Sequence, residues 1–413
     1  MSSDNTADEK PSEREPRAGL LSDIRVLDFG RYVAGPYCAT LLGYLGAEII
    51  RIEKPSGGED RYIAPLTDGP APTEGGVFFQ TACNKKSLTL DLSSEEGRNI
   101  VRELVKTADV VVCSMPPAAL HKLGLDYDSL TALKSDIILT NVTAFGTSGP
   151  YSGKGGFDGI GQAMSGAMHI TGTPGHPVKA AAPYVDYTTA VLGAFGTLAA
   201  LMEKKSSGRG QQVDTSLMGT AMSVFASHLI EQGVTGKNRI GTGNRVQTSA
   251  PSDVFETGDG FILVHTVGNG LFRRLARLIG REDWLDNPAY ATDQSRGDHA
   301  NEICEVVADW CRNLTTEETL ARLEEAGLPA GKVLTPQEAL DHPQVSAMNI
   351  FQQVSFPGLP HPAPVPDLPV KLSYTRGGIK ARPPQLGEQT DEILTQLGYT
   401  EADIKELRDQ TII

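Results

Sequence analysis

The sequence predicts an α/β protein with a large Rossmann-like domain and a second, smaller α+β domain. The chain has 413 residues, more than one hydrophobic core usually serves, so two domains are expected. In the first half, short apolar runs alternate with segments of helical spacing. Each strand–helix–strand unit of this kind requires a right-handed crossover between parallel strands, and repeated units therefore favour a parallel sheet.

The first of these units lies near the start of the chain. Residues 24–29 form a compact apolar run, residues 34–45 have helical spacing, and residues 48–52 form the next apolar run. Further short runs with the composition of strands follow at residues 87–90, 110–113, 137–141 and 211–216.

Two helices of this domain have clear sequence signals. Ser93 and Glu96 have the spacing of a capping box, which predicts a helix from there to about residue 106. A longer helix is expected over residues 187–205, where the surface is almost wholly apolar, so this helix belongs in the core. Flexible turn residues at 206–210 end it.

From about Gly219 the pattern changes, and we expect the smaller domain there. Its predicted strand covers residues 261–266, and a capping box of Thr315 and Glu318 opens one of its helices. Residues 351–385 are rich in proline with little periodicity, which indicates an extended connection. Helices are expected at residues 271–279, 301–312, 316–325 and 391–397.

These patterns give the predicted domain organisation. The polar, charged residues at the start lack the apolar core of a signal peptide, so we expect a disordered tail. The predicted parts are a tail at 1–18, the N-terminal part of the large domain at 19–218, the small domain at 219–330, and a return segment with the C-terminal part of the large domain at 331–413.

Composition excludes several classes of function. The net charge of −14 argues against binding to nucleic acid or anionic membranes, which attract basic surfaces. The apolar run 190–202 is too short to span a bilayer and contains two glycines. Five cysteines without a CxxC spacing indicate reduced thiols and a cytoplasmic location.

The common nucleotide and metal motifs are absent from the sequence. It contains no P-loop, and no GxGxxG follows the first strand. No two of the eight histidines lie three or four residues apart, so no metal site is expected. Cys38 could be a thiol nucleophile in the first helix, although a buried structural cysteine is the more common case.

Asp186 is the most informative residue. It has no charged neighbour in sequence and stands just before the long apolar helix. It could cap that helix, a role that aspartate fills well. It could instead be a covalent nucleophile, held ready by the dipole at the helix N-terminus.

Several short motifs are spread along the chain from about Ile24 to the C-terminus. They lie at residues 26–29, 34–36, 45–49, 52–55, 84–87, 145–146, 149–151, 207–210, 243–245 and 386–390. Each motif is weak by itself, but their number and order are specific. Together they resemble the class III CoA-transferases, a group that includes formyl-CoA transferase, carnitine CoA-transferase and the α-methylacyl-CoA racemases.

The resemblance implies a large domain built from both chain ends and a homodimer whose two chains interlock. It places Asp186 on the catalytic aspartate of the family. The implied reaction moves CoA from an acyl-CoA donor to a carboxylic acid through an aspartyl anhydride and an aspartyl-CoA thioester. Coenzyme A is then a substrate, and no tightly bound cofactor is expected.

The resemblance also implies contacts to coenzyme A. Lys54 matches a position near the nucleotide, Leu90 and Asp91 match a segment that lines the adenine, and Lys122 matches a basic binding residue. Further matching positions are Val33, Ala34 and Asp158.

Two departures from the family pattern bear on function. Residues 113–118 replace the usual Glu-Asn-Phe-Arg-Pro-Gly, which removes an arginine that Lys122 could replace. Phe157 stands where the racemases have a histidine, and phenylalanine cannot exchange a proton.

We therefore expect a CoA-transferase with acyl-CoA, possibly succinyl-CoA, and a small carboxylic acid as its substrates. The alternatives are a 2-methylacyl-CoA racemase or epimerase and a non-catalytic dimer that binds acyl-CoA. Tyr32 and Arg245, with Arg31 and Arg61, could face a dicarboxylate or hydroxy acid.

Overall fold

The computed structural model describes residues 19–67 and 74–413, so the predicted tail at 1–18 lies outside the described residues. The chain forms two compact units. Unit 1 comprises the described residues up to Gly161, together with Pro183–Ala221 and Asn349–Ile413. Unit 2 comprises Gln162–Ala182 and Met222–Met348. This division differs from the predicted limits 219–330, because an earlier segment also belongs to unit 2 and the return to unit 1 comes later.

Unit 1 is built on a six-stranded sheet in which every pair of neighbouring strands is parallel. The strand order β3-β2-β1-β4-β5-β6 is that of doubly wound sheets, and it reverses between β1 and β4. The predicted α/β class with a parallel sheet is confirmed. The strands are β1 (Arg25–Asp28), β2 (Glu48–Glu53), β3 (Lys85–Thr89), β4 (Val110–Cys113), β5 (Ile138–Thr143) and β6 (Gln212–Ser216).

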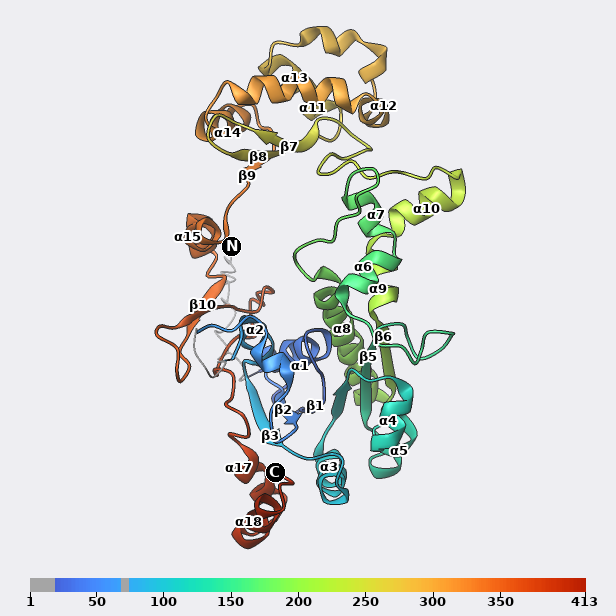
Figure 1. The fold of residues 1–413 in the computed structure, drawn as a ribbon, viewed down its shortest axis with the longest axis vertical. Coiled ribbons are helices and arrows are strands. Elements are labelled where there is room, and N and C mark those ends of the chain that lie inside the picture. Colours follow the sequence, from blue (N-terminus) through green and yellow to red (C-terminus); the bar gives the residue numbers. More distant parts are fainter. Residues whose placement is uncertain (1–18, 68–73) are drawn as a thin grey trace, which may run out of the picture. The chain divides into compact units, whose positions relative to one another are not determined.

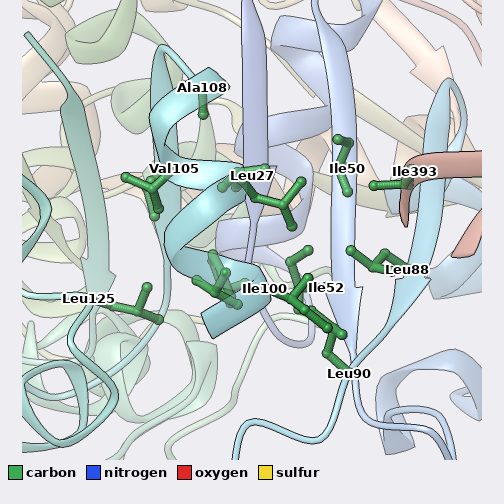
Figure 2. Close-up of a cluster of buried hydrophobic side chains, with 14 of the residues drawn as sticks. Leu27, Ile50, Ile52, Leu88, Leu90, Ile100, Val105, Ala108, Leu125 and Ile393 are labelled. Carbon is green, nitrogen blue, oxygen red and sulfur yellow. The ribbon is translucent and has the colours of Figure 1, made fainter. Parts of the chain in front are cut away.

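Helices cover both faces of this sheet, which explains why the strands are continuous apolar runs. On one face, α1 packs against α8, and α8 also contacts β5 and β6. On the other face, α3 contributes Ile100 and Val105 to the core cluster that includes Leu27 and Ile52 of the sheet, and Figure 2 shows Ile100 beside Ile52. The helices of unit 1 are α1 (Ala34–Tyr44), η1 (Glu59–Tyr62), α2 (Gly76–Ala82), α3 (Glu95–Thr107), α4 (Pro117–Leu123), α5 (Tyr127–Leu133), α8 (Tyr184–Ser207), α17 (Thr390–Gln396) and α18 (Glu401–Asp409).

Three details of the predicted helices are corrected. The cap of α3 is Ser94, whose hydroxyl accepts the Gly97 N–H, whereas the Ser93 hydroxyl bonds to Asp91. Helix α8 begins at Tyr184, three residues earlier than predicted. Helix α18 was not predicted, although Thr400 opens it with a capping box.

Helix α8 is long and apolar enough to cross a membrane by length and composition alone. Half of its most apolar window is buried inside the protein. Ala190, Ala194 and Ala200 of this buried face pack in the cluster that includes Val26 and Ile138 of the sheet. We therefore assign α8 to the core of unit 1.

The C-terminal part of the chain returns to unit 1 (Figure 1). The Pro-rich stretch contains one antiparallel pair, β10 (Phe351–Val354) and β11 (Ala363–Pro366). Beyond it, the Asn84 side chain binds the backbone of residues 378–381. Helix α17 then contacts β3 and contributes Ile393 to the core (Figure 2).

Unit 2 contains a three-stranded antiparallel sheet of β7 (Ser252–Glu256), β8 (Phe261–His265) and β9 (Ala330–Lys332). The capping box of Thr315 and Glu318 opens α14, as predicted. The helices of unit 2 are α7 (Ala167–Thr171), α10 (Ala226–Thr235), α11 (Asn269–Leu278), η2 (Glu282–Asp286), η3 (Pro288–Tyr290), α12 (Asp293–Asp298), α13 (Ala300–Arg312), α14 (Thr316–Glu325), α15 (Pro336–Asp341) and α16 (Pro343–Ala347). Two further helices, α6 (Asp158–Met164) and α9 (Leu217–Val224), contain the residues where the chain passes between units.

Candidate active site

A cavity of about 540 Å³ lies in unit 1. It is formed largely by segments that follow β1, β4 and β5, and the strand order reverses between the first two of these. Open α/β sheets place their ligands at this point, beyond the carboxyl ends of the strands. The lining residues are Arg31, Tyr32, Val33, Ala34, Gly35, Ser114, Met115, Pro116, Val142, Thr143, Ala144, Ser152, Lys154, Gly155, Gly156, Phe157, Ile160, Asp186 and Leu217.

Asp186 is the acidic residue of this lining. It is the third residue of α8, and Pro183 occupies the N-cap position, so the helix-cap alternative for Asp186 is wrong. The residue is only 9% exposed, and no hydrogen bond to its carboxylate occurs among the residues that the structure describes. Burial, and then the negative charge of Asp158, raise the pKa of Asp186 to about 7.

Asp158 caps the start of α8 from a distant part of the chain. One of its carboxylate oxygens accepts the N–H groups of Val185 at 2.7 Å and of Asp186 at 3.1 Å. Both donors belong to the first turn, whose N–H groups have no acceptor within the helix. Asp158 therefore fixes the backbone that carries Asp186, although its own side chain is not part of the cavity lining.

The N-terminus of α1 also faces this cavity. Val33 is its N-cap residue, and Ala34 and Gly35 are its first two helical residues. No side chain caps this end, and its first turn contains no acidic residue. The opening N–H groups of a helix carry a partial positive charge, so this end favours an anion or a developing oxyanion in the cavity.

Two aromatic rings form part of the cavity wall. Tyr32 and Phe157 meet edge to face with their ring centroids 5.0 Å apart. Phe157 is 58% exposed, and Gly155 and Gly156 precede it in the same wall. The two rings give this side of the cavity an apolar wall.

Two cations line the cavity, Arg31 and Lys154. The Arg31 backbone N–H donates to the Ser114 hydroxyl at 2.9 Å, so residues after β1 and β4 are joined. The Lys154 ammonium lies 3.7 Å from the centroid of the Tyr151 ring. The Arg31 guanidinium also donates to the backbone carbonyls of Gly30 at 3.4 Å and Ile52 at 3.3 Å.

The structure brings together four of the predicted site residues, Asp186, Val33, Ala34 and Tyr32. Asp158 joins them through the backbone of α8.

The other predicted coenzyme A contacts lie outside this cavity lining. Lys54 is half exposed and pairs with Glu59 at 2.6 Å. Leu90 is buried in the core, and Asp91 binds Ser93. Lys122 is exposed at the end of α4.

The arginines proposed for the acid substrate divide into three cases. Arg31 lines the cavity, and its role toward a substrate stays a prediction. Arg61 is fully buried and binds both carboxylate oxygens of Glu53 at 2.8 Å, so it does not face a substrate. Arg245 belongs to unit 2, where it lines a small depression with Asp253.

Sequence reasoning missed Lys154, Thr143 and Ser152 as lining residues. Lys154 directly precedes the glycine-rich segment 155–161, and this position was the available signal. Ser114 and Met115 were noticed only as a departure from the family pattern, yet they line the cavity.

The thiol alternative is excluded by burial. All five cysteines are free and buried. Burial raises the pKa of Cys38 to about 12, so its thiol is not ionised near neutral pH. Within the described residues, no group of three or more His, Cys, Asp or Glu side chains could hold a metal ion.

Open parallel α/β sheets bind small-molecule ligands at the switch point, where this cavity and its carboxylate lie. The chain belongs to CoA-transferase family III, whose model matches residues 21–390. It is an enzyme of the CoA-transferase class.

Known proteins that resemble this chain match it over nearly their whole length. The succinyl-CoA–D-citramalate CoA-transferase of Chloroflexus aurantiacus is 35% identical over 97% of this chain and 100% of that protein. The beta subunit of succinyl-CoA–L-malate CoA-transferase from the same organism is 32% identical over 95% of this chain and 98% of that subunit. The crystal structure of a CAIB/BAIF family protein from Brucella suis has a TM-score of 0.80 and 28% identity, and covers 92% of this chain and 100% of that one.

Proposed function

We propose that this enzyme transfers CoA from succinyl-CoA to a small hydroxy or dicarboxylic acid, with Asp186 as the covalent nucleophile. The observation that carries the proposal is the Asp186 carboxylate, which lines the cavity without a hydrogen-bond partner among the described residues. A carboxylate that only stabilised the fold would be paired or hydrogen-bonded.

The proposed reaction has four balanced steps. The Asp186 carboxylate attacks the thioester carbonyl of the donor and displaces CoA as a thiolate, which leaves a mixed anhydride of Asp186 and succinate. The thiolate attacks the aspartyl carbonyl, which gives an aspartyl-CoA thioester and releases succinate. The acceptor carboxylate attacks this thioester and again displaces the CoA thiolate. The thiolate attacks the acyl carbonyl of the second anhydride, which yields the new acyl-CoA and restores Asp186.

The α1 N-terminus supports these steps by stabilising the oxyanions that form at each carbonyl. The N–H groups of Ala34 and Gly35 are the first of that helix and have no acceptor within it. Donors fixed in place before the reaction stabilise developing negative charge at little reorganisation cost. Tyr32 and Phe157 in the cavity wall keep water from the anhydride, which water would hydrolyse.

The donor and acceptor are inferred from chemistry and from relatives. Both relatives described above have succinyl-CoA in their names, and their named acceptors are D-citramalate and L-malate. Succinyl-CoA carries a second carboxylate. Arg31 and Lys154 supply the two positive charges of the cavity lining that could bind it.

Coenzyme A itself is expected to extend beyond the cavity, as the family resemblance implies. Val33, Ala34 and Asp158 lie at or next to the cavity. Lys54 and Lys122 are exposed cations suited to phosphate groups, and Leu90 and Asp91 are proposed for the adenine.

We further propose a cytoplasmic homodimer with interlocked chains. One face of α8 exposes Val191, Phe195 and Met202 at helical spacing, with Phe195 69% and Met202 74% exposed. Large exposed apolar patches mark protein interfaces. The mass in solution tests the dimer: the wild-type protein should have the mass of two chains, and F195D, which places a charge in this patch before the chains assemble, should remain a monomer. A monomeric wild-type protein would contradict it.

A racemase would need a pair of acid–base groups on the two sides of the substrate α-carbon. Phe157 lies in the cavity wall directly before Asp158 in sequence and has no proton to exchange. Among the residues that the structure describes, no observation favours racemisation. Deuterium incorporation at the α-carbon of a 2-methylacyl-CoA would reveal it.

A transfer assay tests the proposed function. The enzyme is incubated with succinyl-CoA and a panel of acids that includes citramalate and malate, and new CoA esters are identified by chromatography. We expect at least one hydroxy dicarboxylate to become a CoA ester. D186N should remain folded and lose this activity, whereas D136N, at a distant aspartate that pairs with Lys204, should retain it. Full activity of D186N would disprove the role of Asp186.

A further inference from the structure

The backbone of Tyr32 has an unusual conformation. Its φ angle is +63°, a left-handed value that residues other than glycine rarely adopt. Such a conformation persists only where the surrounding structure holds it. Tyr32 lines the cavity and stands two residues before α1, so its conformation sets how the α1 N-terminus enters the site.

Two side chains hold this backbone. The Arg31 N–H donates to the Ser114 hydroxyl at 2.9 Å, and the Tyr32 N–H donates to Oδ2 of Asp60 at 3.2 Å. Ser114 belongs to the cavity lining, whereas Asp60 does not. Asp60 lies in η1 and is 3% exposed, so it acts on the cavity from behind the wall.

Asp60 is itself fixed by buried charges. The same oxygen, Oδ2, accepts a hydrogen bond of 2.6 Å from Nη2 of Arg51, which is fully buried in β2. Arg51 also lies 3.2 Å from the carboxylate of Glu53, to which Arg61 binds through two hydrogen bonds. The position of Asp60 is therefore determined by Arg51 of the sheet and not by the segment around Tyr32 that Asp60 holds.

This buried network is incompletely satisfied. Nη1 of Arg51 and Oδ1 of Asp60 have no hydrogen-bond partner within the described residues, and Nε of Arg51 has only its ion-pair contact of 3.2 Å with Glu53. A buried ion pair with unsatisfied atoms is a poor source of stability compared with an apolar pair of the same size. The place of this ion pair directly behind Tyr32 is explained if the pair holds the Tyr32 backbone in its conformation.

We propose that Asp60 is a positioning residue of the transferase: it holds Tyr32 in the left-handed conformation and so fixes the α1 N-terminus and the Tyr32–Phe157 wall. This proposal rests on the proposed function, since it assigns Asp60 a part in the same reaction. Loss of the Asp60 contact lets the Tyr32 peptide rotate, and the N–H groups of Ala34 and Gly35 move away from the developing oxyanion.

Three variants change this contact in different ways. D60A deletes the acceptor, and we expect kcat/KM to fall on the order of ten- to a hundredfold, as for a small misplacement of reacting groups. D60N keeps an oxygen that can accept the Tyr32 N–H, so its loss should be smaller. G58A keeps the charge, but its Cβ would lie 2.2 Å from Oδ1 of Asp60 and displace the carboxylate, so its loss should resemble that of D60A.

A double-mutant cycle separates positioning from general damage. Glycine adopts a positive φ without support, so in Y32G the Asp60 contact is no longer needed. We expect D60A to lower kcat/KM by less than about threefold when Y32G is already present. The matched control is K204M, which breaks a partly buried ion pair with Asp109 elsewhere in unit 1 and should lower Tm while kcat/KM stays unchanged.

The outcomes are distinct. The proposal is overturned if D60A lowers Tm but retains the wild-type kcat/KM, or if the losses of D60A and Y32G multiply fully in the double variant. If D60A does not fold, D60N and G58A decide by the same two criteria. Absence of CoA transfer in the wild-type enzyme would count against the proposed function. In that case, calorimetric binding of succinyl-CoA replaces kcat/KM in the cycle, and unchanged affinity in D60A overturns the positioning role.

Discussion

Asp158 and Asp186 are joined by a hydrogen bond of 3.1 Å, from the backbone N–H of Asp186 to the side chain of Asp158. The two residues are 28 positions apart in sequence, and both are buried. Because Phe157 of the cavity wall directly precedes Asp158, one short segment both shapes the cavity and holds the helix that carries the proposed nucleophile.

Removing the Asp158 side chain should therefore weaken the start of α8. We expect D158A to lower the free energy of unfolding by about 1 kcal/mol, which is typical for loss of a helix cap. D158N should lose less, because its amide oxygen can still accept these N–H groups. Urea unfolding of both variants measures the difference; equal stability of D158A and wild type would contradict the capping role.

The activity should depend on the ionisation of Asp186. Its pKa is raised to about 7, and only the ionised carboxylate is a nucleophile. We expect kcat/KM for succinyl-CoA to fall about tenfold for each pH unit below 7. In D158N the negative neighbour is gone, so the fall should begin at lower pH. A profile that stays flat from pH 5 to 8 would show that Asp186 does not titrate in the reaction.

The free energy of unfolding should also depend on the titration of Asp186. The folded-state pKa of Asp186 lies above the ordinary value of 3.8, so the folded protein binds this proton more tightly than the unfolded chain. The stabilisation present at low pH is lost as the pH rises from about 4 through 7, at about 1.4 kcal/mol for each pH unit.

D186N lacks this titration and should be more stable than wild type above pH 7, with the difference shrinking toward pH 4. Unfolding by denaturant at a series of pH values checks the sign. A difference that grows as the pH falls would contradict the raised pKa.

The cations of the cavity should select the donor. We expect R31M and K154M to raise KM for succinyl-CoA at least several-fold and to change KM for butyryl-CoA little, because butyryl-CoA has the same length without the second carboxylate. Steady-state kinetics with both donors make the comparison. An equal effect on both donors would assign Arg31 and Lys154 to coenzyme A and not to the acyl group.

The parallel sheet could be predicted from sequence because buried parallel strands are continuous apolar runs, as in β4. The start of α8 could not, since its cap comes from Asp158, far away in sequence. Helix α18 could have been found, because Thr400 and Asp403 have capping-box spacing.

The site was predictable in part, and the sheet topology explains which part. Val33 and Ala34 follow β1, which borders the switch point, and they line the cavity. Lys54 follows β2 and Leu90 follows β3, which lie farther toward one edge, so neither lines it. Local patterns indicate strands, whereas only the strand order reveals which loops meet.

The most direct measurement is the mass of the peptide that contains Asp186 after brief incubation of the enzyme with succinyl-CoA and rapid acid quenching. The account predicts that this peptide gains the mass of coenzyme A less one water, that the adduct disappears when acceptor acid is added, and that D186N shows none. An active enzyme that forms no adduct on Asp186, or forms one on another residue, would contradict it.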